Sequence, residues 1–531
     1  MKLRALAAGA AALLLASGVA FADEGHEGHG QVGKVNFANS CSPAVQADFL
    51  RGVAMLHSFW YSAGEQTFRD VLAKDPTCAI AGWGIASILM SNPLAGVGSS
   101  PKDAEKAQAA LEQAHKTGAR TPRERDYIDA VAAYYQDWAS RPEKARQEAR
   151  SKAYEALAAR YPKDDEAQIF SALYIAGTQS QADQTYAAYG KAAAILEKQF
   201  AKYPNHPGVA HYLIHVYDAP PIAQHGLTAA RRYAGLAPAA PHALHMPSHI
   251  FTRVGAWEDS VATNGRSFAV AVKGGEPGEA YHATDYAVYA DLQLGRDAAA
   301  LSAMGEAFKV KVTPSSSFAA HYALAAMPAR YAMERGDWRG AMQLEATGNK
   351  LPYAEAITWF ARALGAARSG DAAAAEQSAL QLAVQHQALV DAKNTYWATE
   401  VEIQQGAVAA WIAFAQKKPE EALKLMRAVA DLEDKNEKHI VTPGRIVPAR
   451  ELLGDMLMEA GQPALALKEY EASQVREPNR FRGYYGAARA AEAAGDRKKA
   501  GVYYGRLVAL AKHADSQRPE LARAKAYVAH G

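Results

Sequence analysis

The sequence lacks net charge, strand signals and any long apolar run after its first 22 residues. The 58 basic side chains nearly balance the 56 acidic ones. Proteins that bind nucleic acid carry a basic surplus or patch, so we expect no nucleic-acid partner. No later stretch approaches the roughly 18 to 20 apolar residues that a membrane-spanning helix needs. Alternating β-branched runs with tight Asn-Gly turns are nearly absent, which argues against a β fold.

The first 22 residues have the pattern of a secretory signal peptide. Lys2 and Arg4 give a positive start, an apolar run covers residues 5–16, and an Ala-Phe-Ala triplet ends at Ala22. This pattern predicts cleavage after Ala22 and a periplasmic or secreted protein with no integral membrane segment. An uncleaved membrane anchor is the alternative, but the apolar run is short and rich in alanine. Loss of Lys2 and Arg4 would leave 56 basic and 56 acidic side chains.

Cysteine is also scarce, with Cys41 and Cys78 as the two examples. An even count in an oxidising compartment favours one disulfide, and two buried free thiols are the alternative. Each cysteine lies near the start of a predicted helix, one repeat apart. Corresponding helix starts in a repeat array are neighbours, so a Cys41–Cys78 bridge is geometrically reasonable.

Helical periodicity runs along almost the whole chain, and its repeat length is the strongest indication of fold. Gly461 and Gly495 are 34 residues apart, as are Gly336 and Gly370. Each falls between two helical segments, where a helix commonly ends with a residue of positive φ. In the middle of the chain the spacings between such glycines rise to 40 and 41 residues.

These features resemble tetratricopeptide repeat (TPR) proteins. Residues 49–76, FLRGVAMLHSFWYSAGEQTFRDVLAKDP, carry Gly52, Phe68 and Pro76 near the positions expected for a TPR. The resemblance covers most of residues 44–514 and is most specific in the last two repeats. It implies an all-α solenoid of stacked helix pairs that forms a right-handed superhelix with a concave groove.

The periodicity places the first helix of each pair at a definite position, and the second helices fill the gaps. The first helices are predicted near residues 45–61, 78–90, 122–138, 164–178, 207–217, 241–254, 279–294, 316–334, 353–368, 395–416, 448–460 and 481–494. The predicted divisions are a signal peptide (1–22), a flexible His/Gly-containing segment (23–40), N-terminal TPR-like repeats (41–206), central His-rich repeats (207–295), further helical repeats (296–445), C-terminal TPR repeats (446–514) and a C-terminal tail (515–531).

Histidine is concentrated in the central repeats. Eight of the 17 histidines lie in the 77 residues from 206 to 282, where an even spread would place between two and three. They are His206, His211, His215, His225, His242, His245, His249 and His282. Neighbouring first helices of a TPR array lie side by side, so three of them can bring their imidazoles together.

Two histidines four apart on a helix can both reach one zinc, copper, nickel or iron ion, with a third ligand from elsewhere in the fold. Pro247 breaks or kinks its helix and re-aims its neighbouring histidines. The predicted metal ligands are His211, His215, His245, His249 and His282. Residues predicted to orient these ligands or to line a ligand groove are Asp218, His242, Arg253, Asp285 and Tyr286.

Residues 211–295 also resemble a group of bacterial TPR proteins that carry HMPSHI-like and HxxDY-like segments. Here these segments are HMPSHI at 245–250 and HATDY at 282–286. The resemblance implies no particular reaction. It implies a shared site formed by His245, His249, Arg253, His282, Asp285 and Tyr286.

Three functions are consistent with these patterns. The first is a binding or adaptor protein with a transition-metal site and a protein, peptide or small-ligand partner. The second is a metal-dependent hydrolase or oxidoreductase, and the third is a metal-free assembly scaffold. The sequence has no G-x-S-x-G elbow, no H-E-x-x-H motif and no phosphate-binding loop, so we expect no nucleotide cofactor. His26 and His29 form either a weak metal site or part of a solvated tail, and the stretch 57–61 is interpreted as core.

Overall fold

The computed structural model describes residues 30–313, 317–346, 348 and 350–530. The predicted signal peptide and the segment with His26 and His29 lie outside these residues. The compact part of the chain begins at Gln31. Among the described residues, none of the helices combines the length and the apolar character that crossing a bilayer requires.

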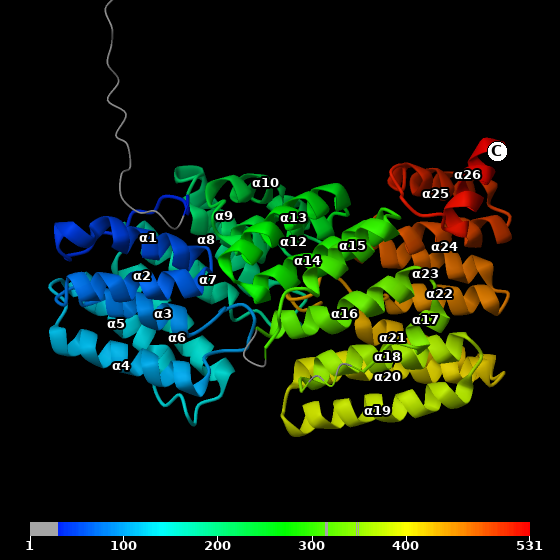
Figure 1. The fold of residues 1–531 in the computed structure, drawn as a ribbon, viewed down its shortest axis with the longest axis horizontal. Coiled ribbons are helices and arrows are strands. Elements are labelled where there is room, and N and C mark those ends of the chain that lie inside the picture. Colours follow the sequence, from blue (N-terminus) through cyan, green and yellow to red (C-terminus); the bar gives the residue numbers. More distant parts are fainter. Residues whose placement is uncertain (1–29, 314–316, 347, 349, 531) are drawn as a thin grey trace, which may run out of the picture. The chain divides into compact units, whose positions relative to one another are not determined.

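The described part of the chain is all-α, and successive helices pack against each other in pairs (Figure 1). The first helices of the pairs are α1 (Gln46–His57), α3 (Ile80–Leu89), α5 (Pro122–Tyr135), α7 (Asp165–Ala176), α9 (Pro207–Val216), α11 (Pro241–His245) with α12 (Pro247–Arg253), α14 (Pro277–Gln293), α16 (Phe318–Glu334), α18 (Pro352–Arg368), α20 (Thr395–Ala415), α22 (Ala449–Glu459) and α24 (Phe481–Ala493). Each overlaps the range predicted for it, and the all-α fold of stacked helix pairs is confirmed.

The second helices fill the gaps as expected. They are α2 (Tyr61–Lys74), α4 (Pro101–Thr117), α6 (Glu143–Arg160), α8 (Ala187–Lys202), α10 (Leu227–Leu236), α13 (Trp257–Gly274), α15 (Asp297–Ala307), α17 (Trp338–Met342), α19 (Ala372–Asp391), α21 (Pro419–Glu433), α23 (Pro463–Arg476) and α25 (Arg497–Leu510). The segment predicted as a C-terminal tail contains one more helix, α26 (Pro519–His530), which packs on α25.

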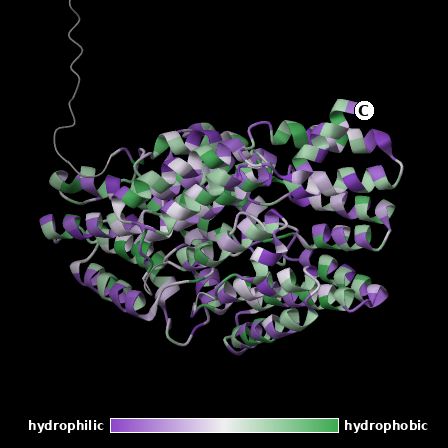
Figure 2. Ribbon diagram, turned by 45° about the vertical axis from the view of Figure 1, so that its right-hand side comes forward, coloured by the Kyte–Doolittle hydropathy of each residue, from purple (hydrophilic) through white to green (hydrophobic). Residues whose placement is uncertain are grey.

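The first and second helices differ in burial, and this difference decides which of them can carry an interior site. In α14 every residue from Ala280 to Gln293 is buried, whereas the preceding helix α13 buries one face and exposes the other. The alternation of hydrophilic and hydrophobic residues along the helices is visible in Figure 2. Polar side chains on the central first helices therefore lie inside the protein, where they need partners.

The turn glycines identified in the sequence have the expected backbone conformation. Gly255, Gly295 and Gly336 have φ between 66° and 69°, in the left-handed region that favours glycine. Each one ends a buried first helix and lets the second helix turn back over it.

Contacts between distant repeats add to the packing of neighbours. The Arg480 guanidinium, fully buried at the start of α24, donates to Glu451 of α22 and to Glu334 of α16, both at 2.7 Å. Trp257 of α13 donates to the carbonyl of Asn479 at 2.7 Å. The bonds of Arg480 to Glu334 and of Trp257 to Asn479 join the C-terminal repeats to earlier repeats across more than 140 residues of sequence.

Residues 434–448, which we call the inner segment, connect α21 to α22 without an α-helix. The sequence predicts helical repeats up to residue 445, but residues 434–445 contain no helix. Its side chains at Asn436, Glu437, Lys438, His439 and Thr442 are buried. A connection of this length without regular structure is uncommon in a compact domain and usually has a function.

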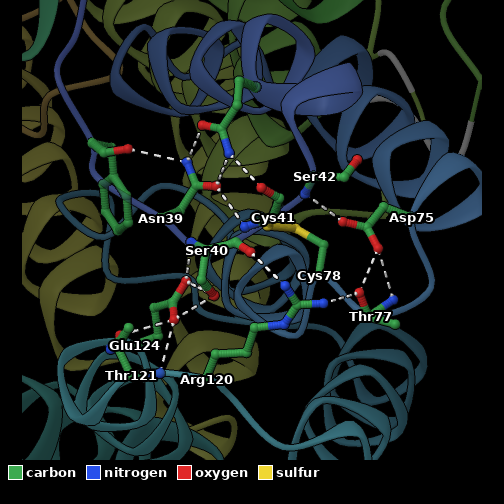
Figure 3. Close-up of a disulfide and its surroundings, with 12 residues drawn as sticks. Asn39, Ser40, Cys41, Ser42, Asp75, Thr77, Cys78, Arg120, Thr121 and Glu124 are labelled. Atoms are coloured by element: carbon green, nitrogen blue, oxygen red, sulfur yellow. Dashed lines mark hydrogen bonds between the residues drawn. A yellow bond between two sulfur atoms is a disulfide. The ribbon is translucent and has the colours of Figure 1, made fainter.

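The predicted disulfide is present between Cys41 and Cys78, with Cα atoms 4.7 Å apart (Figure 3). Hydrogen bonds tie residues beside both of its ends to α5 and to the turn before it. Arg120 donates to the carbonyl of Ser40 at 3.3 Å and to the Thr77 hydroxyl at 2.9 Å. The Glu124 carboxylate accepts hydrogen bonds from the backbone and the hydroxyl of Ser40. Residues 31–40, the end of the segment predicted to be flexible, pack here through the buried side chain of Phe37.

Replacement of both Cys41 and Cys78 by serine should lower the free energy of unfolding by about 3–4 kcal/mol, because the bridge closes a loop of 37 residues in the unfolded chain. Urea denaturation of the two proteins measures this difference. A reducing agent should destabilise the wild-type protein by the same amount and leave the double variant unchanged. Equal stability of wild type and variant would contradict a structural role for the bridge.

Candidate metal centre

Six histidines of the central repeats form one buried cluster, and each is 8% exposed or less. They come from four consecutive first-helix segments: His211 and His215 from α9, His242 and His245 from α11, His249 from α12, and His282 from α14. The five predicted ligands are therefore together. His242, predicted as a groove residue, lies among them. The imidazoles lie in the protein interior and do not line an open groove.

Pro247 divides one first helix into α11 and α12, as its position predicts. Met246, which joins the two helices, keeps a helical backbone conformation. His245 and His249 therefore remain one turn apart. Their Nε2 atoms lie 3.1 Å from each other. The break therefore preserves the pairing of these two imidazoles.

The cluster consists of two sets of three histidines. In each set one potential ligand atom per residue lies within 4.8 Å of the other two. The first set is His211, His215 and His242, and the second set is His245, His249 and His282. Each set takes two residues four apart from one first helix and a third residue from the next. Nitrogen ligands about 2.1 Å from a tetrahedral ion are roughly 3.4 Å apart, so small side-chain adjustments bring each set to a coordinating geometry.

In the second set, hydrogen bonds determine which nitrogen carries the proton. His249 Nδ1 lies 2.8 Å from Asp218 Oδ2, and His245 Nδ1 lies 2.7 Å from Asn264 Oδ1. The Asp218 oxygen is an acceptor because it belongs to a carboxylate. Asn264 Oδ1 is an acceptor because the amide donates through its Nδ2, to the Ser260 carbonyl at 2.8 Å. Each Nδ1 therefore carries the hydrogen. In the neutral imidazoles, both Nε2 atoms then present lone pairs to each other at 3.1 Å.

The first set shows a related arrangement. His211 Nδ1 donates to the His57 carbonyl at 2.7 Å, which leaves a lone pair on His211 Nε2, 3.1 Å from His215 Nε2. His242 Nδ1 faces the Glu279 carboxylate at 3.2 Å, and its Nε2 is buried without a hydrogen-bond partner among the described residues. His282 Nδ1 in the second set is likewise buried and unpartnered in that part of the chain. The cluster thus contains buried imidazole nitrogens whose hydrogen-bonding capacity no described protein group satisfies.

Asp218, immediately after α9, connects the second set to the inner segment. Its carboxylate accepts hydrogen bonds from His249, from Arg253 Nε at 2.7 Å and from Lys438 Nζ at 3.4 Å. Burial opposes ionisation, but Lys438 and Arg253 outweigh it and hold the pKa of Asp218 well below its ordinary value. A charged carboxylate that accepts from a ligating histidine fixes the ring and makes its other nitrogen a better ligand.

Burial also favours the neutral form of five of the six imidazoles. It lowers the pKa of His211, His215, His245 and His282 well below the ordinary value, and neighbouring histidines lower it further. The pKa of His249 is lowered by burial as well, although Asp218 opposes that shift. Neutral imidazole is the form that binds metal ions.

The other predicted residues around the cluster have different partners. Arg253 pairs with Asp218. Asp285 pairs with the fully buried Arg330 at 3.0 Å. The Tyr286 hydroxyl lies 3.1 Å from the carbonyls of Ile440 and Thr442 in the inner segment, and its ring centroid lies 4.7 Å from that of His245.

His57, Glu166 and His206 form a third buried group that no motif in the sequence predicts. His57 Nε2 and His206 Nε2 face the Glu166 carboxylate at 2.9 and 3.0 Å. The remaining nitrogens accept from the Tyr212 hydroxyl and from the backbone N–H of Val209. Hydrogen bonds therefore satisfy this group without an ion. No local pattern indicated it, because its members lie on three separate helices or turns.

The inner segment was also missed, because it has no periodic pattern. Lys438 reaches Asp218, and His439 lies one residue further along. His439 Nε2 donates to the Ala95 carbonyl at 3.2 Å, and its Nδ1 accepts from the backbone N–H of Val441 at 3.2 Å. Burial lowers the pKa of His439 to about 4.

No protein-family model and no curated protein matches this chain. Among solved structures, the chain is similar to a crystal structure of the APC/C hetero-tetramer Cut9–Hcn1, with a TM-score of 0.28 and 10% sequence identity. The match covers 92% of this chain and 96% of that chain.

Asp218→Asn should lower the free energy of unfolding by about 3–5 kcal/mol, because it leaves the cations of Arg253 and Lys438 buried without their shared carboxylate. Chemical denaturation of the metal-free protein measures the loss. Asp129→Asn, at a side chain that is 64% exposed, is the matched control and should change stability by less than about 0.5 kcal/mol. Similar values for both variants would show that Asp218 does not organise the interior.

His439 should contribute a pH-dependent part of the stability. Its pKa is about 4 in the folded protein, against about 6.5 in the unfolded chain. The neutral ring therefore stabilises the fold fully above about pH 6.5, and this contribution of up to ~3 kcal/mol is lost as the pH falls toward 4.

His439→Gln removes this titration, so the stability difference between wild type and variant should shrink by that amount between pH 7 and pH 4. Denaturation curves across this range provide the measurement. His115→Gln, at a side chain that is 51% exposed, should keep the wild-type pH profile. A His439→Gln profile parallel to wild type would disprove the assignment.

Proposed function

We propose that this protein binds transition-metal ions through the two three-histidine sets of its central repeats. The observation that carries this proposal is the pair His245 and His249. Their Nε2 atoms face each other at 3.1 Å, while both Nδ1 atoms are hydrogen-bonded to oxygen acceptors. An arrangement of two opposed lone pairs in a buried position needs a positively charged partner between them.

A proton is a poor candidate for that partner. Protonation of either imidazole would place a positive charge in the interior, and burial lowers the pKa of both His245 and His249. Leaving the two acceptors unsatisfied is also costly, at about 1–3 kcal/mol per group. A metal ion accepts both lone pairs at once and can take a third from His282.

The ligand type narrows the metal. All six candidate ligands are imidazoles, which suit zinc, copper, nickel and iron. Calcium and magnesium prefer carboxylate, carbonyl and water oxygens. Asp218 occupies the position of an orienting carboxylate and does not add a ligand to the set.

The wider role that fits this centre is that of an exported binding or adaptor protein. Disulfides persist in oxidising compartments, so the Cys41–Cys78 bridge supports the export that the N-terminal pattern predicts. Stacked helix pairs offer extended surfaces for a protein partner. A metal-dependent enzyme and a metal-free scaffold are the competing functions, and metal analysis separates the scaffold from the other two.

The test is the metal content of untagged protein purified from its native compartment. We expect bound zinc, copper, nickel or iron at about one equivalent or more per chain, with His249→Ala reducing it and with circular dichroism unchanged. His225→Ala, at an exposed histidine of the same repeats, is the matched control and should retain the wild-type content.

Two results would reject the proposal. One is less than about a tenth of an equivalent of each metal together with no uptake on titration. The other is a His249→Ala protein that keeps the full metal content. The first result would favour the metal-free scaffold, and the second would place the bound metal away from His249.

A further inference from the structure

The two histidine sets adjoin so closely that they form a single group. Between the sets, the ring centroids of His215 and His249 are 5.7 Å apart, and those of His242 and His245 are 6.0 Å apart. Within the sets, centroid distances range from 4.2 to 6.4 Å. Rings of different sets are therefore as near as rings of the same set.

The helical repeat explains why the sets adjoin. The α11–α12 segment contributes His242 to the first set and both His245 and His249 to the second. One first-helix segment thus holds a ligand of each set on adjacent turns. Two ions bound in this way would be neighbours, within reach of one small ligand between them, as in two-metal sites where the ions lie about 3.5–4 Å apart.

The charges around the cluster restrict which ions fit. Imidazole binds a metal ion in its neutral form, so the six ligands bring no charge of their own. Asp218 and Glu437 carry negative charges, but Arg253 and Lys438 balance them at hydrogen-bond and ion-pair distances. Glu279, at the periphery beside His242, adds one further carboxylate. Two divalent ions would therefore bring charge into a buried place that lacks enough counter-charge, which is costly.

Monovalent copper meets this restriction. Copper in its reduced form carries one charge, and imidazole is a ligand that suits copper. Oxidation of the pair would raise the charge by two, unless an anion with two negative charges appeared between the ions at the same time. Dioxygen reduced by two electrons is such an anion.

We propose that the two sets hold a pair of copper ions that act together and that the reduced pair binds dioxygen between them. This inference rests on the proposed function. Each Cu(I) gives one electron, and dioxygen takes both and becomes a bound peroxide. The oxygen–oxygen bond is reduced from double to single, copper–oxygen bonds form, and no proton is needed. The combined charge of the two coppers and the oxygen ligand is the same before and after the step.

Burial selects the size of the substrate. The six imidazoles are 8% exposed or less, so a large organic substrate cannot reach the pair without opening of the fold. Tyr286 and the inner segment close the second set from one side through the hydrogen bonds to Ile440 and Thr442. The substrate class is therefore a small oxidant gas.

The decisive experiment uses the full mature protein, loaded with Cu(I) under anaerobic conditions and then exposed to dioxygen. We expect about two coppers per chain, a new charge-transfer absorption band on exposure, and an electron paramagnetic resonance signal that accounts for only a small part of the copper. The weak signal would follow from coupling of two neighbouring Cu(II) ions through their shared ligand.

Other outcomes on the wild-type protein have distinct meanings. No copper uptake, together with no other metal, defeats the proposed function itself. Uptake of zinc alone, of one copper per chain, or of two coppers whose resonance signal accounts for all of the copper would overturn the paired centre and leave metal binding standing.

Variants that remove one ligand from each set provide the second test. His215→Ala and His282→Ala should each lower the copper content from about two to about one per chain, restore a full resonance signal for the remaining copper and abolish the dioxygen-dependent band. His225→Ala should behave as wild type. Retention of the band by either ligand variant contradicts a centre that needs both sets. If a ligand variant misfolds, His215→Gln and His282→Gln replace it, and the wild-type result decides independently.

Discussion

The interior of the central repeats depends on one buried carboxylate. Asp218 follows α9, and it accepts from His249 and Arg253 of α12 and from Lys438 of the inner segment. One side chain therefore joins two neighbouring repeats and a connection more than 200 residues further along the chain. Because Asp218 is ionised, the cations of Arg253 and Lys438 can be buried beside it, and His249 carries its hydrogen on Nδ1. The orientation of the second histidine set, and so its capacity to hold an ion, follows from that proton.

The same principle operates at three of the other imidazoles, which are oriented by neighbours outside the cluster. Asn264 of α13 positions His245, the His57 carbonyl at the end of α1 positions His211, and Glu279 of α14 faces His242. Because the orienting groups come from separate repeats, the two sets exist only when the repeats are stacked. The centre is in this sense a product of the helix stacking and not of any one repeat. The Cys41–Cys78 bridge and the bonds of Arg480 hold other parts of the stack at its two ends.

The sequence by itself determined the fold class and the positions of the helices. The turn glycines and the regular spacing are local signals, since a positive φ at Gly255 or Gly336 depends only on the residue and its neighbours. The pairs His211–His215 and His245–His249 were also predictable, because four residues on a helix correspond to one turn. The excess of histidine in the central repeats indicated where to look.

Only the tertiary structure decided how these parts combine. It placed His242 with the first set, paired Asp285 with Arg330, and assembled His57, Glu166 and His206 from helices far apart in sequence. It also brought Lys438 and His439 of the inner segment into the interior, although nothing periodic marks that stretch. Such contacts cannot be read from a sequence because they depend on which buried polar group finds a partner once the helices are packed. A buried donor or acceptor must be satisfied, and the packing of distant repeats determines which group satisfies it.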